Sequence, residues 1–176
     1  MLEVGEPVLF SGTGCQVGAL HKYLKRDYEN LLTIDMVCNG VASPQIWSDF
    51  LAWREKELGE KIVGVDFRNK KRYGWNRTHI ETVTTASGEH DSYLYSKLYC
   101  SGFNRPSCYK CKYCNKDRPG DITIADFWGH EKALFDLWND DKGISLAIVN
   151  TGKGLRWWGK ASEWLECVEC TGYPFQ

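Results

Sequence analysis

The sequence lacks a long apolar run, an excess of charge of one sign and a targeting pattern at its start. No apolar stretch approaches the roughly 20 residues that a membrane-spanning helix needs. Lys and Arg total 22 against 23 Asp and Glu, so no overall field favours nucleic acid or a membrane surface. The first residues do not show the basic-then-apolar order of a signal peptide. These absences predict a cytoplasmic protein with no membrane span and no nucleic-acid partner.

The sequence also lacks internal repeats, low-complexity segments and a dinucleotide fingerprint of the G-x-G-x-x-G kind. Its 176 residues are enough for one domain with a hydrophobic core of its own. We therefore predict a single domain over residues 1–176.

Apolar stretches that suit strands alternate along the chain with stretches whose apolar residues recur at helical spacing. Strands are predicted within residues 7–13, 31–40, 61–68, 121–129, 143–150 and 165–170, and helices within 16–26, 43–58, 130–139 and 151–164. Residues 73–103 predict a strand, a turn at Ser87-Gly88, and then a helix or an extended arm. This alternation indicates an α/β fold, with a mixed, mostly parallel sheet flanked by helices and a Cys-rich loop within residues 104–120.

The chain does have eight cysteines, three of them in that loop. Cys108, Cys111 and Cys114 follow a C-x-x-C-x-x-C pattern. In a reducing compartment, clustered thiols are more often metal ligands or redox groups than disulfides. Three sulfurs complete neither a tetrahedral metal site nor a cubane iron–sulfur cluster, so the pattern predicts a further ligand from elsewhere in the chain. Cys100, in an aromatic stretch, is predicted to be a core residue.

Two more cysteines follow predicted strands. Cys15 begins a predicted helix after the turn formed by Gly12, Thr13 and Gly14, where backbone amides and the helix dipole stabilise negative charge. Cys38 ends the next predicted strand. Open α/β sheets usually build their sites at the carboxyl ends of strands, so Cys15 and Cys38 are the candidate missing ligands, with the turn beside the bound group. A buried structural cysteine is the alternative for Cys15.

Three other residues follow the same strand ends, namely Asn39, Asp126 and Trp128. Asp126 either orients a ligand or a cofactor hydroxyl, or it caps the helix predicted from residue 130. The basic and aromatic stretch 68–77 suits a phosphate-bearing cofactor, an RNA contact or a solvated hairpin tip.

Five segments in order resemble the carboxyl-terminal domain of the coenzyme F420 hydrogenase/dehydrogenase beta-subunit family. They are VLFSGTGCQVGALHKYL, TIDMVCNGVASPQIW, RYGW, NRPSCYKCKY and DITIADFWG, and the resemblance runs over about residues 7–153. It implies the electron-transfer domain of an oxidoreductase. Family members are iron–sulfur flavoproteins that pass electrons between a cluster, FAD and, in methanogens, the deazaflavin coenzyme. Many bacterial relatives occur with surface-polysaccharide enzymes.

Carried over residue by residue, the resemblance implies that Cys15, Cys38, Cys108 and Cys111 bind a four-iron, four-sulfur ([4Fe–4S]) cluster. Cys114 lies outside the part of the loop that can be matched.

The chain departs from the family pattern in three places. Gly14 stands where the family usually has Pro, which loosens the turn, and Asn39 stands where His is common, which removes a group that titrates near neutral pH. Family members also carry a further amino-terminal segment before the first of the five motifs. We therefore expect the chain alone to hold little FAD. The missing segment, or a redox partner protein, would complete the flavin site and reach the deazaflavin or another electron acceptor.

Zinc is the competing metal. Cys108 and Cys111 with Cys167 and Cys170 would make a site of two C-x-x-C pairs. The chain would then be a zinc-stabilised, non-catalytic binding module associated with polysaccharide biosynthesis. That assignment leaves the cysteines after the strands unexplained, so we favour the cluster.

Overall fold

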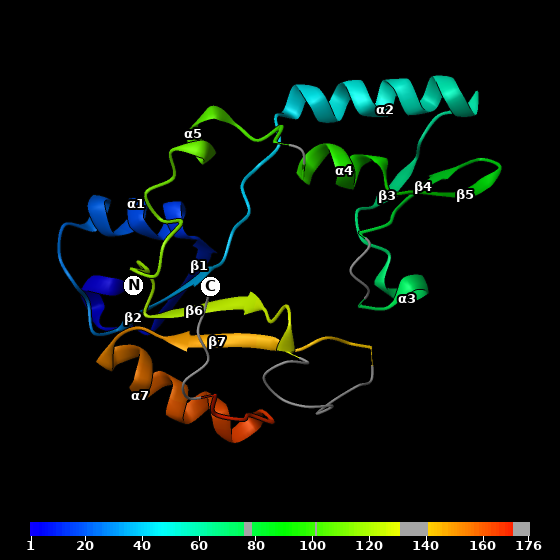
Figure 1. The fold of residues 1–176 in the computed structure, drawn as a ribbon. Coiled ribbons are helices and arrows are strands. Elements are labelled where there is room, and N and C mark those ends of the chain that lie inside the picture. The colour runs from blue at the N-terminus through cyan, green and yellow to red at the C-terminus, as the bar shows by residue number, and fades with distance from the viewer. Residues whose placement is uncertain (76–78, 101, 131–140, 171–176) are drawn as a thin grey trace. The chain divides into compact units, whose positions relative to one another are not determined.

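Figure 1 shows the fold as a computed structural model, which describes residues 1–75, 79–100, 102–130 and 141–170. The chain divides into two compact units. Unit 1 comprises Met1–Asn39, Cys111–Asn139 and Gly143–Gln176, and unit 2 comprises Gly40–Lys110 and Asp140–Lys142. The chain thus leaves unit 1 after the second predicted strand and returns to it inside the cysteine loop.

Unit 1 is built on a four-stranded sheet in the order β1-β2-β6-β7. Its strands are β1 (Val8–Thr13), β2 (Leu31–Met36), β6 (Ile122–Asp126) and β7 (Ser145–Val149). β1, β2 and β6 are parallel, whereas β7 runs antiparallel to β6. Among its described residues, the helices are η1 (Leu2–Val4), α1 (Gly14–Leu24), α7 (Gly152–Ala161) and η2 (Ser162–Trp164). α1 packs against β1 and β2, and α7 packs against β2 and β7 (Figure 1).

Polar side chains fill the centre of this sheet. The buried polar residues on β2 and β6 and just before β6 are Thr33, Asp35, Asp121 and Thr123. Their hydrogen-bonding groups find partners within the unit, as buried polar groups must if they are not to destabilise the fold. We call these four residues, with Arg118 and Lys153, the polar centre.

Unit 2 holds a three-stranded antiparallel sheet in the order β3-β4-β5. Its elements are α2 (Pro44–Leu58), β3 (Gly64–Asp66), α3 (Lys70–Tyr73), β4 (Glu81–Thr85), β5 (Gly88–Ser92), α4 (Leu94–Cys100) and α5 (Pro106–Tyr109). Ser43 is the N-cap of α2 and Pro44 its first residue, as the sequence predicts.

Four aromatic rings pack against one another in unit 2. Trp47 lies with its ring centroid 5.7 Å from Phe50, 4.7 Å from Phe67 and 4.8 Å from Tyr95. These spacings are those of attractive ring pairs. We call the four rings the aromatic cluster.

Short backbone contacts clamp together the two ends of the main part of unit 2. Ala42 and Asn104 form an antiparallel bridge. On either side of it, Arg105 N donates to Val41 O at 2.8 Å and Ser43 N donates to Phe103 O at 3.3 Å. Residues 42–104, which we call the insert, therefore begin and end side by side.

The α/β fold with a mixed, mostly parallel sheet is confirmed, and an antiparallel sheet accompanies it. The prediction of a last strand over residues 165–170 is wrong. Leu165 and Val168 are 54% and 49% exposed, so this segment has no buried face that would hold it in a sheet. The helix predicted over residues 130–139 lies almost wholly outside the described residues. The single-domain assignment stays a prediction.

No helix within the described ranges combines the length and the apolar character needed to cross a membrane.

Candidate metal centre

Cys15 is the second residue of α1, at the carboxyl end of β1. Gln16 accepts a hydrogen bond from Thr13 N at 2.8 Å and so closes a capping box over this helix start. Gly12 leaves room for it, because a Cβ there would lie 2.9 Å from the Gln16 side-chain oxygen. Thr13 Oγ1 lies 3.1 Å from Cys15 Sγ, in hydrogen-bonding contact. The thiol is thus exposed at a helix N-terminus with a hydroxyl beside it, and the buried structural alternative is excluded.

Cys38 lies two residues beyond β2. Val37 N donates to Ile124 O at 3.0 Å, so the pairing of β2 with β6 continues to the residue before Cys38. The cysteine itself is exposed. Because β1 and β2 are parallel neighbours, their carboxyl ends meet at one edge of the sheet, and the two cysteines follow that edge.

Tyr113, between the last two cysteines of the loop, packs on α1. A Cβ on Gly18 would stand 2.3 Å from the Tyr113 hydroxyl oxygen, so the ring lies directly against the helix backbone. A Cβ on Gly14 would stand 3.1 Å from Tyr113 Cβ. Gly14, one of the departures from the family pattern, is therefore buried under the loop. Any side chain there would press on Tyr113.

Arg118 ties the same loop to β2. Its Nη2 and Nε atoms donate to Asp35 Oδ1 at 2.6 and 3.1 Å, and its Nη1 donates to Tyr113 O at 2.6 Å. Asp35 Oδ2 accepts from Gly120 N at 2.8 Å. The Asp35 side chain is fully buried and that of Arg118 is 8% exposed. The ion pair is therefore internal and hydrogen-bonded at both ends, which is the condition under which a buried pair is tolerated.

Asp121 forms the second half of the polar centre. Thr33 donates to Asp121 Oδ2 from its backbone N at 2.9 Å and from its hydroxyl at 2.8 Å. Thr151 donates to Oδ1 at 2.7 Å, and Lys153 Nζ lies 3.3 Å from Oδ2. Burial by itself raises the pKa of Asp121. The hydrogen bonds from Thr151 and Thr33, with the charge of Lys153, outweigh burial and hold that pKa below its ordinary value. Asp121 is thus an ionised structural group.

Gly154 lets the start of α7 lie against the backbone of Asp121. A Cβ on Gly154 would stand 2.3 Å from Asp121 O, so only glycine allows the start of α7 to lie so close to β6.

One signal of the polar centre is visible in the sequence, a lone carboxylate at Asp35 inside an apolar strand. Its partner has no such signal, because Arg118 lies far along the chain.

The remaining predicted site residues lie at the ends of the same strands or just beyond them. Asn39 is exposed, and so is Asp126 at the end of β6. Trp128 is 43% exposed, and its backbone N donates to Asp126 O at 3.1 Å. A role of Asp126 in capping the next helix concerns residues outside the described ones.

The eight cysteines all lie among the described residues, and they form no disulfide there. The six exposed ones are Cys15, Cys38, Cys100, Cys111, Cys114 and Cys167, while Cys108 and Cys170 are half-buried. Cys100 was predicted to be a core residue, and this is wrong, because it ends α4 with its side chain in solvent. Across residues 1–75, 79–100, 102–130 and 141–170, no three His, Cys, Asp or Glu side chains already surround one metal position.

The structure thus brings together the segments that carry Cys15, Cys38 and Cys111 and places Cys108 in α5 of unit 2. The donors of unit 1, which are Cys15, Cys38 and Cys111, suit a soft metal or an iron–sulfur cluster chemically, since they are exposed thiols on segments that side chains of this unit hold together. The Cys167 and Cys170 pair of the zinc alternative lies on the irregular segment after η2.

Within the basic stretch 68–77, part of the described residues form the short helix α3. Asn69 caps α3 by accepting from Arg72 N at 3.1 Å. Arg72 Nη1 then lies 3.0 Å from Asp91 of β5, and the Tyr73 hydroxyl donates to the same carboxylate. Asp91 therefore neutralises part of the charge that a phosphate would use.

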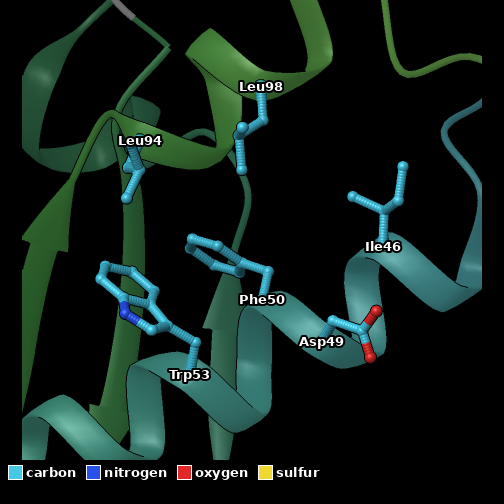
Figure 2. A pocket seen from close by; sticks show the side chains of 6 residues that line it. All are labelled: Ile46, Asp49, Phe50, Trp53, Leu94 and Leu98. Atoms are coloured by element: carbon cyan, nitrogen blue, oxygen red, sulfur yellow. The ribbon is translucent and has the colours of Figure 1, made fainter.

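Unit 2 contains a hollow of about 330 Å³ between α2 and α4. Figure 2 shows its lining, which is Ile46, Asp49, Phe50, Trp53, Leu94 and Leu98. This lining contains no cation, so it does not suit the pyrophosphate of FAD.

A sequence model of the coenzyme F420 hydrogenase/dehydrogenase family, covering the C terminus of its beta subunit, matches residues 5–170. The chain belongs to this family. The match spans both units and includes every cysteine of the chain. A search of curated proteins gives no significant match. The F420 hydrogenase/dehydrogenase beta-subunit assignment makes the chain a relative of oxidoreductase subunits, and it confirms the resemblance on which the ligand prediction rests.

Proposed function

We propose that this chain is the iron–sulfur electron-transfer domain of a flavin-dependent oxidoreductase. Cys15, Cys38, Cys108 and Cys111 would bind a [4Fe–4S] cluster, which when bound supplies one-electron transfer. The observation that carries the proposal is the convergence in unit 1. The loop that carries Cys111 is packed by Tyr113 on the helix of Cys15, and by Arg118 on the strand that leads to Cys38.

The chain's own groups prepare the first of these ligands. Cys15 stands at the N-terminus of α1, where unpaired backbone N–H groups and the helix dipole favour a thiolate-bound anionic group. The Thr13 hydroxyl donates to Gln16 Oε1 at 3.1 Å and lies 3.1 Å from the Cys15 sulfur. If its proton turned to the sulfur, it would supply one of the hydrogen bonds to ligand sulfurs that set a cluster's potential. Thr13, Gly12 and Gly14 thus serve as the turn that shapes this end of the site.

FAD remains the proposed electron partner of the cluster. A bound flavin needs a concave site with donors for its phosphates, which the hollow in unit 2 lacks. A beta subunit works with other polypeptides, and we propose that a redox partner protein or a further segment provides the rest of the flavin site. Equilibrium titration of the chain with FAD, with and without that partner, measures this. Tight binding by the chain alone would contradict it.

The experiment that tests the cluster is anaerobic purification after expression with ample iron, followed by iron, sulfide and zinc analysis and an absorption spectrum. We expect brown protein with iron and acid-labile sulfide near cluster stoichiometry. Cys15→Ser and Cys38→Ser should lower bound iron as severely as Cys111→Ser, because each removes one ligand. Colourless protein with about one bound zinc would contradict the proposal.

Cys100→Ser, Cys167→Ser and Cys170→Ser are matched controls, since each replaces a thiol outside the proposed ligand set. Their iron content should equal that of the unchanged protein. If metal is lost only when Cys108, Cys111, Cys167 or Cys170 is changed, these four thiols bind zinc and the proposed ligand set is wrong. Circular dichroism of each variant separates loss of a ligand from loss of the fold.

A further inference from the structure

One guanidinium hydrogen-bonds two of the segments of unit 1 that carry proposed cysteine ligands and lies beside the third. Arg118 Nη1 donates to Tyr113 O at 2.6 Å, in the cysteine loop. Its Nη2 donates to Met36 O at 3.1 Å, two residues before Cys38. The same Nη2 atom lies 3.4 Å from the place where a Cβ on Gly14, the neighbour of Cys15, would stand.

The charge of this guanidinium is balanced where it lies. Asp35, fully buried, takes two of its N–H groups and is itself held by Gly120 N. Gly120 is required for this approach, because a Cβ there would stand 2.8 Å from Asp35 N. Arg118 is thereby fixed in position with its remaining donors aimed at the loop and at the end of β2. A planar fork of donors can satisfy several acceptors at once in this way, whereas a single ammonium cannot.

We propose that Arg118 is the positioning residue of the metal centre, because its hydrogen bonds hold the segments of Cys38 and Cys111 together beside the segment of Cys15. The nature of the bound group rests on the proposed function. The positioning of the segments does not, since it follows from contacts within unit 1.

The first test uses the metal-free chain and an endoproteinase specific for lysine, which cleaves after Lys110, Lys112 and Lys116 in the loop. The variant is Arg118→Met combined with Asp35→Asn. It leaves no uncompensated buried charge, and Asn still accepts from Gly120 N, so the fold is expected to persist. Loop cleavage should be about tenfold faster or more, because hydrogen bonds from a charged donor to two carbonyls are lost.

Arg156→Met is the matched control, an arginine of the same unit whose side chain is 62% exposed and pairs with Glu29 at the surface. Its cleavage rate should equal that of the unchanged chain. If the double variant is also cleaved at the unchanged rate, the proposal is overturned, whatever metal the protein binds.

The second test uses protein reconstituted with iron and sulfide under anaerobic conditions. The double variant should bind less iron than the unchanged chain, because the segments that carry the ligands are no longer held together. Arg118→Lys tests the planar fork itself. It keeps the charge but not the fork of donors, so in this variant too loop cleavage should rise and iron uptake should fall.

The two tests keep this inference apart from the proposed function. If the unchanged chain takes up no cluster, the proposed function fails, while faster loop cleavage in the double variant still supports Arg118 as the positioning residue. If the unchanged chain takes up a cluster and the double variant keeps its full iron content, Arg118 does not position the centre.

Discussion

The two units of this chain differ in the contacts that hold their elements together. The polar centre of unit 1 has charges that each find partners at fixed angles, from Arg118 with Asp35 to Lys153 with Asp121. The aromatic cluster of unit 2 consists of rings that pack at several angles. Directional contacts specify one geometry, whereas apolar packing mainly stabilises. Three of the four proposed ligands, Cys15, Cys38 and Cys111, belong to unit 1, whose contacts are directional, and Cys108 belongs to unit 2.

Removing one partner of the buried ion pair is expected to have the largest effect. Asp35→Ala leaves the Arg118 charge buried without a counter-ion, which costs about 3–5 kcal/mol of unfolding free energy. Urea unfolding followed by circular dichroism measures this, and hydrogen exchange of peptides from β2 assigns it to unit 1. Asp27→Ala, at an exposed carboxylate of the same unit, is the control. A loss no larger than that of the control would mean that unit 1 does not depend on its polar centre.

Truncating the aromatic cluster should cost slightly less and should act elsewhere. Phe50 is 5% exposed, and Phe50→Ala should cost about 3 kcal/mol, toward the lower end for such changes because a hollow already adjoins the ring. Trp53→Ala, 41% exposed on the same helix, should cost less. Iron uptake per folded chain should be unchanged. If Phe50→Ala lowers iron uptake as much as Asp35→Ala does, the polar centre matters no more for placing the ligands than the aromatic cluster does.

A smaller change tests the contact between the cysteine loop and α1. Gly18→Ala places a Cβ about where the Tyr113 hydroxyl lies, so the ring has to move, at a cost of about 1–3 kcal/mol. Gly159→Ala, on α7 with no atom within 4 Å of its Cβ position, should instead stabilise by up to about 1 kcal/mol. Thermal unfolding compares the two. If both substitutions stabilise the protein, Tyr113 does not pack on the helix.

The smallest expected effect is the loss of stability as the pH falls. The pKa of Asp121 is lowered in the folded chain, so its contribution to stability is present above the unfolded pKa of about 3.9 and is lost as pH falls through the lower folded value. The pKa of Asp91 in unit 2 is lowered too, by its hydrogen bonds from Thr82 and Tyr73.

The two carboxylates differ in burial, with Asp121 7% exposed and Asp91 24% exposed. Hydrogen exchange measured along a series of falling pH should therefore show β6 of unit 1 losing protection before β5 of unit 2. Asp121→Asn should flatten the acid dependence of unit 1. If β5 opens first, the more exposed carboxylate matters more than the polar centre.

Local pattern was enough to predict the elements that carry Cys15 and Cys38. The apolar run before Cys15, the helical spacing after it and the second apolar run before Cys38 each reflect one element, and β1, α1 and β2 form there. Parallel neighbours then bring both cysteines to one edge. The helix predicted over 151–164 also forms, although its last turn is the 3₁₀ helix η2.

The sequence could not predict how the loop is held. Arg118 meets Asp35 across 83 positions of chain, and no local period marks such a pair. The close contact of Tyr113 with Gly18 is equally long-range and depends on a missing side chain. The strand predicted over 165–170 failed for a related reason, because apolar alternation makes a strand only where a neighbouring strand and a buried face exist.

The clamp at Ala42 and Asn104 has a consequence for how the chain reaches its fold. β2 must pair with β6 across the whole of unit 2, and closing so long a loop is slow when the intervening chain is unfolded. Once unit 2 folds, its clamped ends turn that loop into a short connection. We expect folding to run from the insert outward, so that Phe50→Ala slows the refolding of unit 1 as well as weakening unit 2. Stopped-flow refolding that reports on β2 and β6 would reveal the order of assembly.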